Sequence, residues 1–393
     1  MLALDEDWRR VTVRVEELRA EQNRGSKEIA STEPSARQGV IARLRETSTE
    51  LKRLESEQAR LEEALRDVAA RLPNVPEEGA PDGVSEEDNV EVRRWGEVPR
   101  FDFEPRDHLA LGESLGIIDV ERAARTSGSR FTYLTGAAAR IQFALVRMGM
   151  DFAQARGFTP VIPPVLVREE AMFGTGFLPT DAVNIYSTRE DDLYLIGTAE
   201  VPLASLHAHE ILDVRELPRR YVGYSTCFRR EAGTYGKDMR GIFRLHQFDK
   251  LEMFSFVIPE ASRDEHQRFL GWEEEFFQSL QIPYRVVDTC TGDLGAAAAR
   301  KFDVEAWVPS QSTYREVTST SNTTDFQARR LECRVRLADG NRTAHTVNGT
   351  LCAIGRTLLA LLENHQRKDG SVVLPSVLHA FLPERDHVLT PAR

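Results

Sequence analysis

The sequence predicts an α+β protein built from a helical arm and a larger domain that contains both strands and helices. Residues 1–72 carry apolar side chains at helical spacing and almost no proline. Residues 73–107 are rich in proline, glycine and acids, which is typical of a linker that leads into a second domain. Residues 108–393 combine segments with the two-residue period of strands and segments with helical spacing.

Length and charge limit the classes of protein that fit. A chain of 393 residues with 41% hydrophobic residues can form two or three domains with a sizeable core. The net charge of −11 argues against nucleic-acid binding by the surface as a whole. Residues 1–72, however, contain 14 Lys+Arg and 15 Asp+Glu, so they are almost neutral. A phosphate backbone would meet less repulsion there than elsewhere on the chain.

Residues 1–72 predict two long antiparallel helices that pack as a coiled-coil arm. The segment 31–35 is the expected turn between them. Positions expected in the seam follow three- and four-residue steps: Trp8, Val11, Val15, Leu18, Gln22, Ile29, Val40, Leu44, Thr47, Leu51, Leu54, Gln58, Leu61, Leu65, Val68 and Leu72. A coiled coil used for dimerisation or for stiffness would show the same periodicity.

The sequence has no feature typical of membrane or secreted proteins. No apolar run reaches the ~18–20 residues of a membrane span, and the opening residues, MLALDEDWRR, do not resemble a signal peptide. The four cysteines are scattered and form no C-x-x-C pair: Cys227, Cys290, Cys333 and Cys352. We therefore expect free thiols, a cytoplasmic protein and no zinc site.

The second domain is expected to begin with a helix and an interrupted strand. Residues 137–157 show apolar side chains at helical spacing. The strand expected at 158–167 contains three prolines, which confine it to the edge of a sheet or to an interface. A core helix packed on an edge strand would fit these residues as well as a dimer interface would.

Residues 221–256 predict two strands joined by a long polar loop. In the second strand, residues 242–256, the side chains of Arg244, Phe248 and Glu252 fall on one face. A cation, an aromatic ring and a carboxylate in a row suit a phosphate, a base and an amino group. A solvated sheet face can carry similar charges, but an aromatic residue among them favours a binding surface.

Polar residues also accompany three other predicted elements. Thr198 and Glu200 follow a strand, where a helix cap is the simpler interpretation. Strands are expected at 301–308 and 314–319. The sequence 348–350 predicts a loop before a helix that contains Arg356. That arginine has apolar neighbours, so it either extends its charge to water or binds a phosphate, and we favour phosphate.

Four segments carry a family resemblance: GTAEVPLASLH, FRREAGTYGKDMRGIFRLHQFDKLE, EVTSTSNTTDFQARR and HTVNGTLCAIGRTLLALLENHQ. In this order they resemble the signatures of seryl-tRNA synthetases, and the second resembles motif 2 of the class II aminoacyl-tRNA synthetases. The similarity runs from about Leu4 to about Leu382. It implies a class II catalytic domain over residues 108–393, with an antiparallel sheet flanked by helices. Residues 137–167 resemble motif 1, which implies a homodimer.

The resemblance implies ATP-dependent attachment of L-serine to tRNA(Ser), with residues 1–72 gripping the tRNA and Mg²⁺ assisting. The implied catalytic residues are Arg229, Glu316 and Arg356. The implied ATP-binding residues are Arg229, Arg230, Glu231, Leu245, Phe248, Glu316, Val317, Thr318, Ser319 and Arg356. The implied serine-binding residues are Thr198, Ala199, Glu200, Arg229, Glu252 and Thr350. Glu316 and Ser319 would bind Mg²⁺.

Three alternatives and one departure qualify this interpretation. An amino acid:carrier-protein ligase would share the core, but it would lack the arm and use zinc. An inactive paralogue that only binds would be expected to have lost Arg229, Glu316 or Arg356, and all three are present. A duplicate enzyme dedicated to biosynthesis or resistance would carry the same signatures. Relatives usually begin with an extra helix, so either that helix is missing here or the true start lies upstream.

Overall fold

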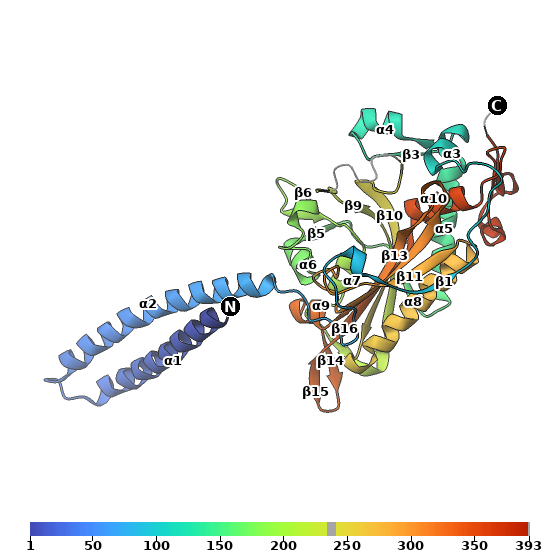
Figure 1. The fold of residues 1–393 in the computed structure, drawn as a ribbon. Coiled ribbons are helices and arrows are strands. Elements are labelled where there is room, and N and C mark those ends of the chain that lie inside the picture. The colour runs from blue at the N-terminus through green and yellow to red at the C-terminus, as the bar shows by residue number, and fades with distance from the viewer. Residues whose placement is uncertain (234–240, 392–393) are drawn as a thin grey trace. The chain divides into compact units, whose positions relative to one another are not determined.

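The computed structural model describes residues 1–233 and 241–391 (Figure 1). The chain divides into two compact units, Met1–Leu72 and Pro73–Arg393, and each is described by itself. Residues 234–240, which belong to the polar loop expected between the two strands of 221–256, lie outside the described residues. Within the described residues, no helix is long and apolar enough to cross a membrane.

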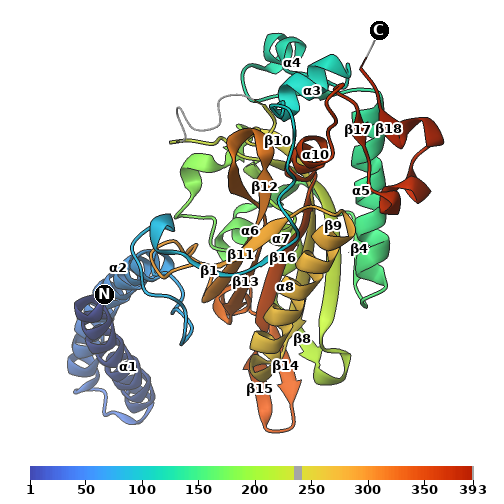
Figure 2. The same ribbon diagram turned by 45° about the vertical axis from the view of Figure 1, so that its right-hand side comes forward.

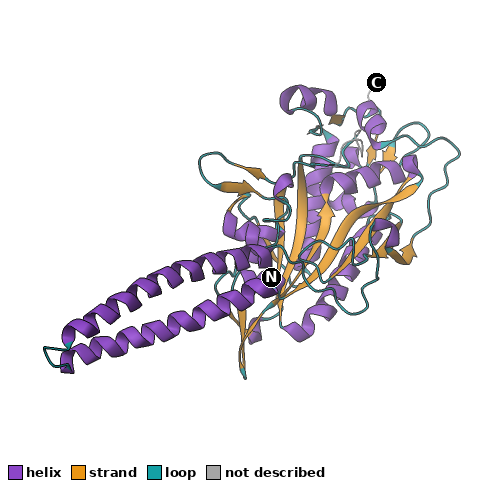
Figure 3. Ribbon diagram, turned by 60° about the vertical axis from the view of Figure 1, so that its left-hand side comes forward, coloured by secondary structure: helices purple, strands orange, loops and turns teal. Residues whose placement is uncertain are grey.

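The first unit is a pair of long helices, as predicted (Figure 3). Helix α1 is Leu2–Ser31 and helix α2 is Arg37–Ala70. Their contact is formed by side chains of the predicted seam: Val11, Val15, Leu18, Leu51, Leu54 and Leu61. Ion pairs such as Arg19 to Glu55, at 2.8 Å, flank the seam. Because exposed ion pairs contribute at most about 1 kcal/mol each, burial of the apolar seam is the main source of stability.

The seam ends earlier than the periodicity predicts. Val68 and Leu72 are 36% and 45% exposed. The amide of Gln58 donates a hydrogen bond to Thr12 across the antiparallel pair at 2.9 Å, which sets the register of the two helices. In that register Val68 and Leu72 lie level with or beyond the first residues of α1. Within the described residues, α1 therefore leaves both side chains partly uncovered.

The second unit is built on an eight-stranded sheet (Figures 1 and 2). The strands, in spatial order, are β1 Val90–Trp95, β11 Tyr284–Asp288, β12 Arg300–Val308, β13 Thr313–Thr324, β16 His345–Ala353, β10 Gln247–Val257, β9 Arg219–Phe228 and β4 Thr159–Val161. All neighbouring pairs are antiparallel except β4 and β9, which are parallel. The predicted antiparallel sheet is confirmed.

Helices pack on this sheet and complete the core. Helix α5 contacts β9, β10 and β16, while α8 contacts β13 and β16, and α10 contacts β10 and β12. Figure 2 shows α8 lying along the strands. The helices of this unit are α3 His108–Ser114, α4 Val120–Ser127, α5 Ala137–Gln154, α6 Glu169–Gly174, α7 Glu200–Ser205, α8 Ser262–Ser279, α9 Phe326–Arg330 and α10 Ile354–Asn364.

In the described part of this unit, short strands form four smaller sheets. They are β2 Ile118–Asp119 with β3 Tyr133–Leu134, β5 Leu166–Arg168 with β7 Leu193–Leu195 and β6 Tyr186–Ser187, β8 Ile211–Asp213 with β14 Arg334–Leu337 and β15 Gly340–Thr343, and β17 Val372–Val373 with β18 Val388–Leu389.

Two predicted elements differ from those observed. The strand expected from Ile242 begins at Gln247, because the backbone N–H groups of Ile242 and His246 bond to other elements instead of a neighbouring strand. The N–H of His246, for example, donates to the carbonyl of Arg130 at 3.0 Å. The loop expected at 348–350 is part of β16, in the interior of the sheet. Its glycine is required by packing, since a Cβ at Gly349 would lie 2.6 Å from Glu273 Oε1.

Segment 73–107, expected to be a linker, contains additional structure. Its strand β1 forms one edge of the large sheet by pairing with β11. The side-chain amide of Asn74 donates to the carbonyls of Ala297 and Thr323 at 2.9 and 2.8 Å. The segment is therefore an integral part of the second unit. At the opposite edge, β4 contains Pro160, at the kind of edge position predicted from its prolines.

Candidate active site

Two adjoining cavities open on one side of the large sheet. The first, the arginine cavity, has a volume of about 290 Å³ and is lined by residues that include Arg229, Arg244 and Arg356. The second, the carboxylate cavity, has a volume of about 420 Å³ and is lined by residues that include Glu200 and Glu252. Both cavities are lined by the same five side chains where they meet: Arg229, Lys250, Lys301, Ser319 and Thr350.

At one end of the arginine cavity, Arg356 pairs with Glu316. Its Nη1 lies 3.2 Å from a carboxylate oxygen of Glu316 and donates to the main-chain carbonyl of the same residue at 3.0 Å. Burial would raise the pKa of Glu316, but the charges of Arg356, Lys301, Arg229 and Arg244 outweigh it and hold the pKa at about 2. Glu316 is therefore ionised at neutral pH and surrounded by cations.

The other end of the arginine cavity has an aromatic floor. The guanidinium of Arg229 lies 5.5 Å from the ring centroid of Phe248 and donates to the carbonyl of Gly197 at 3.2 Å. Glu231 pairs with Arg244 at 3.2 Å. Its backbone has φ of +50°, a left-handed conformation that costs a non-glycine residue about 1 kcal/mol or more. Such backbone strain indicates that the surrounding structure holds the Glu231 side chain in one position.

The carboxylate cavity contains a buried cation between hydroxyl and carboxylate groups. Lys250 forms an ion pair with Glu252 and donates to the hydroxyl of Thr350 at 3.3 Å. The same hydroxyl donates to Glu252 Oε2 at 3.3 Å. Lys250 and Glu252 lie two residues apart on β10, so the alternation of the strand places both on the side of Phe248.

Glu200 is the second acid of this cavity. Its Oε1 accepts hydrogen bonds from the amides of Gln327 at 2.7 Å and Asn348 at 3.0 Å. Burial, reinforced by the negative charge of Glu252, raises the pKa of Glu200 to about 7 despite the opposing charge of Lys250. Two acids thus face a space large enough for a small ammonium compound.

The structure brings most of the predicted site residues together. The arginine cavity is lined by Arg229, Glu231, Leu245, Phe248, Glu316, Val317, Thr318, Ser319 and Arg356. The carboxylate cavity is lined by Thr198, Glu200, Arg229, Glu252 and Thr350. Two of the predicted residues line neither cavity. The guanidinium of Arg230 lies 5.6 Å from the ring centroid of Tyr186, and Ala199 is fully buried against Gly223.

Sequence reasoning missed several residues that line the same space. Lys250 lies at alternate positions of β10 with Phe248 and Glu252, so strand alternation alone predicts that its side chain shares their face. Lys301 lies opposite Ser321 in the pairing of β12 with β13, close enough for its charge to lower the pKa of Glu316, and no local pattern shows this. Gln327 and Asn348 act through Glu200 and come from α9 and β16. Their convergence depends on the tertiary fold.

The site fits a magnesium–phosphate group. Glu316 supplies an ionised carboxylate and Ser319 a hydroxyl, and both line the arginine cavity. Mg²⁺ prefers oxygen ligands and often takes only one or two from the protein, with water and phosphate supplying the rest. The described residues, this site included, hold no cluster of three or more His, Cys, Asp or Glu side chains suited to a metal ion.

The geometry defines what the site can bind. Cations beside an aromatic ring suit a nucleoside polyphosphate, and buried acids with hydroxyl groups suit a small amino compound. Arg229 lines both cavities, so one guanidinium can contact an anionic group of each ligand. The arrangement is suited to joining a carboxylate to a phosphate.

Comparison with known proteins agrees with this geometry. Residues 183–365 match the family described as tRNA synthetase class II core domain (G, H, P, S and T), and residues 1–76 match the seryl-tRNA synthetase N-terminal domain. The serine–tRNA ligase of Acidothermus cellulolyticus is 54% identical over 392 residues, which cover 100% of this chain and 93% of that protein. The serine–tRNA ligase of Rhodococcus jostii is 51% identical over 383 residues, covering 97% and 91%.

Solved structures show the same relationship. The seryl-tRNA synthetase from Pyrococcus horikoshii complexed with ATP superimposes with a TM-score of 0.93 at 42% identity, covering 100% of this chain and 93% of that one. The cytoplasmic serine–tRNA ligase from Naegleria fowleri in complex with AMP gives a TM-score of 0.87 at 33% identity, covering 100% and 91%. The fold is that of a class II aminoacyl-tRNA synthetase. Within that class, the chain belongs to the seryl-tRNA synthetase family.

Proposed function

We propose that this chain attaches L-serine to tRNA(Ser) in two ATP-dependent steps through a seryl-adenylate. The observation that carries the proposal is the meeting of the arginine and carboxylate cavities at Arg229, Lys250 and Lys301. A nucleotide in the first cavity and serine in the second would bring the serine carboxylate and the α-phosphate to these cations. The serine–tRNA ligases at 54% and 51% identity support the same reaction.

In the first step, a serine carboxylate oxygen bonds to the α-phosphorus while the bond from that phosphorus to pyrophosphate breaks. This reaction depends on positioning and charge neutralisation, and it needs no protein nucleophile. Arg229 would hold the carboxylate beside the α-phosphate, and Arg356 would hold the far phosphates. In the second step, the terminal ribose hydroxyl of the tRNA takes the seryl group and AMP leaves.

Adenine would be held in the arginine cavity by its ring faces and its amino group. Phe248 offers a ring for stacking, and Leu245 offers backbone contacts. Glu231 can accept from the adenine amino group, with Arg244 keeping its carboxylate in place at 3.2 Å. Mg²⁺ would be held by Glu316 and Ser319 and would offset phosphate charge. The P. horikoshii relative, which was solved with ATP, supports a nucleotide at this site.

Serine would be recognised in the carboxylate cavity by its two polar ends. Glu252 and Thr198 would receive the ammonium group, and the Thr350 hydroxyl would bond the serine hydroxyl. Glu200, held by Gln327 and Asn348, would add negative charge. A pocket that hydrogen-bonds a hydroxyl rejects analogues without one, because buried polar groups would be left unpaired.

Residues 1–72 would form the tRNA-binding arm, residues 73–107 the segment leading into the catalytic domain, and residues 108–393 the catalytic domain. The match of residues 1–76 to the seryl-tRNA synthetase N-terminal domain supports this assignment. Exposed cations on the arm, which is nearly neutral overall, would contact tRNA phosphates.

The catalytic unit would form a homodimer through helix α5 and the edge of the sheet at β4. Two large apolar side chains are exposed on and beside these elements: Phe143 at 64% and Ile162 at 81%. A second copy of the chain would cover them. We also propose a cytoplasmic location, in line with the description of the N. fowleri relative.

Aminoacylation tests the proposal directly. The purified protein is incubated with ATP, Mg²⁺, radiolabelled serine and tRNA(Ser), and label in acid-insoluble tRNA is counted. We expect label that disappears after mild base treatment, since an aminoacyl ester is base-labile. Absence of charging by folded protein would contradict the proposal.

A further inference from the structure

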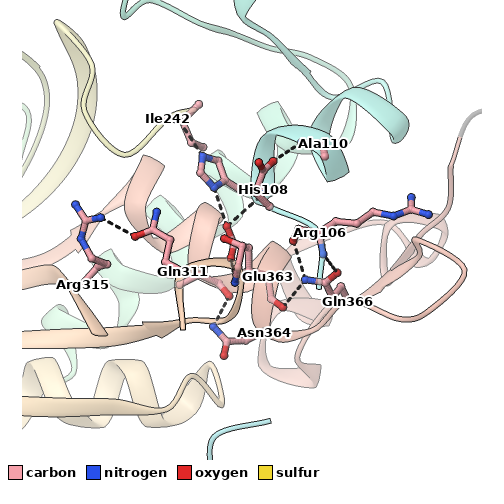
Figure 4. A network of polar contacts seen from close by, with 12 residues as sticks. Arg106, His108, Ala110, Ile242, Gln311, Arg315, Glu363, Asn364 and Gln366 are labelled. Atoms are coloured by element: carbon pink, nitrogen blue, oxygen red, sulfur yellow. Dashed lines mark hydrogen bonds and ion pairs between the residues drawn. The ribbon is translucent and has the colours of Figure 1, made fainter. Parts of the chain in front are cut away.

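A buried polar network lies behind the arginine cavity, around His108 and Glu363 (Figure 4). His108, the first residue of α3, is 4% exposed, and Glu363, near the end of α10, is fully buried. His108 Nδ1 lies 2.8 Å from Glu363 Oε1, and the backbone N–H of His108 donates to the same oxygen at 3.0 Å. Neither residue lines either cavity.

The second ring nitrogen of His108 identifies the tautomer. The backbone N–H of Ile242 points at Nε2 over 3.1 Å. Because an N–H can only donate, Nε2 must be an unprotonated acceptor, and Nδ1 carries the proton that is donated to Glu363. The preceding Gly241 has φ of +92°, and a Cβ there would lie 2.0 Å from Nε2. Only glycine permits this approach.

Ile242 begins a segment that forms one wall of the arginine cavity. This segment, residues 242–245, lines the cavity along its whole length. The carbonyl of Phe243 accepts from Arg356 Nε at 3.5 Å. The Phe243 ring lies 4.1 Å from the guanidinium of Arg315 and 4.6 Å from that of Arg356. The position of Phe243 therefore helps to set the position of Arg356.

The second carboxylate oxygen of Glu363 is linked to Phe243 by a different set of contacts. Oε2 accepts from the backbone N–H of Ser310 at 3.0 Å. The adjacent Gln311 accepts from Arg315 Nη1 at 2.6 Å, and Arg315 lies against the Phe243 ring. One buried carboxylate is thus linked to Phe243 along two routes, one through the imidazole and Ile242 and one through the 310–311 turn and Arg315. Figure 4 shows Glu363 together with His108, Ile242, Gln311 and Arg315.

We propose that His108 and Glu363 are positioning residues for ATP, which fix the wall 242–245 and through Phe243 orient Arg356. This inference rests on the proposed function, because it takes the arginine cavity to be the ATP site. It concerns ATP and not serine, since no residue of 242–245 lines the carboxylate cavity. Removing the contact between His108 and Glu363 should therefore change the binding of MgATP and the binding of serine by different amounts.

The test compares His108→Ala with His365→Ala in the full-length protein. His365 is a matched control, because it also lies at the end of α10 and its Nε2 bonds to the carbonyl of Leu280 at 3.0 Å. Within the described residues, no hydrogen bond, ion pair or ring contact joins it to the wall. The dissociation constant of MgATP is measured by calorimetry without serine, and the KM of serine by pyrophosphate exchange. We expect His108→Ala to weaken MgATP binding about tenfold, as befits one buried hydrogen bond left unmade, with serine KM within about twofold.

A conservative variant separates positioning from folding. In His108→Gln the amide oxygen can accept from the Ile242 N–H, so we expect MgATP binding to recover at least in part. If His108→Ala does not fold, His108→Gln provides the test. We then expect a severalfold increase in the dissociation constant of MgATP and no change in the KM of serine. Unchanged MgATP binding in a folded variant, or equal losses for both ligands, would overturn the inference. Wild-type protein that binds MgATP but shows no serine-dependent exchange would instead contradict the proposed function.

Discussion

Replacing Arg356 with alanine removes one cation from the arginine cavity while leaving its surroundings in place. The side chain is 20% exposed, and it contacts Glu316 together with the carbonyl and the ring of Phe243. Loss of one preorganised electrostatic contact to a developing charge costs roughly 10²–10³ in rate, or about 2.7–4 kcal/mol. We therefore expect seryl-adenylate formation to fall by that factor.

Two structural features indicate that Arg356→Ala should slow seryl-adenylate formation without disturbing the rest of the site or the fold. Glu316 keeps the positive charges of Lys301, Arg229 and Arg244 nearby, so its carboxylate should stay ionised at neutral pH. Helix α10 keeps its buried leucines, so the fold should lose no more than about 1 kcal/mol. Arg342→Ala is the control, because Arg342 forms an exposed ion pair with Glu260 at 2.7 Å outside both cavities.

The assay is serine-dependent exchange of labelled pyrophosphate into ATP, together with thermal unfolding of each variant. Arg356→Ala should be folded and should exchange pyrophosphate slowly, whereas Arg342→Ala should match the wild type in both assays. Folded Arg356→Ala with near wild-type exchange would refute the phosphate role of Arg356.

The remaining predictions concern pH, the arm and salt. Because burial and Glu252 raise the pKa of Glu200 to about 7, its carboxylate ionises as pH rises from 6 to 8. The KM of serine should therefore fall over that range, and Glu200→Gln should flatten the profile; an identical profile in both proteins would count against a role for Glu200. A truncated chain that begins at Pro73, and so keeps the Asn74 contacts, should still exchange pyrophosphate but fail to charge tRNA. Normal charging by it would refute the tRNA role of the arm. Full-length tRNA affinity should fall steeply with salt, as counterion release requires, and a flat salt dependence would argue against phosphate contacts.

Sequence patterns predicted the elements whose period is regular. The seam of α1 and α2 followed from apolar spacing, because a two-helix arm has no other core. The common face of Phe248 and Glu252 followed from strand alternation, which β10 maintains. The prolines of 158–167 indicated an edge, and β4 is one.

Features that depend on tertiary pairing escaped prediction. Asn348 and Gly349 resemble a turn locally, but β10 and β13 pair with them on both sides, so the segment is a strand. Residues 242–246 continue the alternation of β10, yet their backbone bonds to other elements. The electrostatic interaction of Lys301 with Glu316 depends on the pairing of β12 with β13, which is a property of the sheet and not of either segment.

The central claim is that one site joins the carboxylate of serine to the α-phosphate of ATP. Pyrophosphate exchange by the wild-type protein, measured with serine and with alanine at equal concentrations, tests it most directly. The Thr350 hydroxyl and Glu252 lie 3.3 Å apart in the carboxylate cavity, and alanine lacks the hydroxyl with which serine would bond to Thr350. We predict robust exchange with serine and at least about 100-fold slower exchange with alanine. Equal exchange with the two amino acids, or none with serine, would contradict the account.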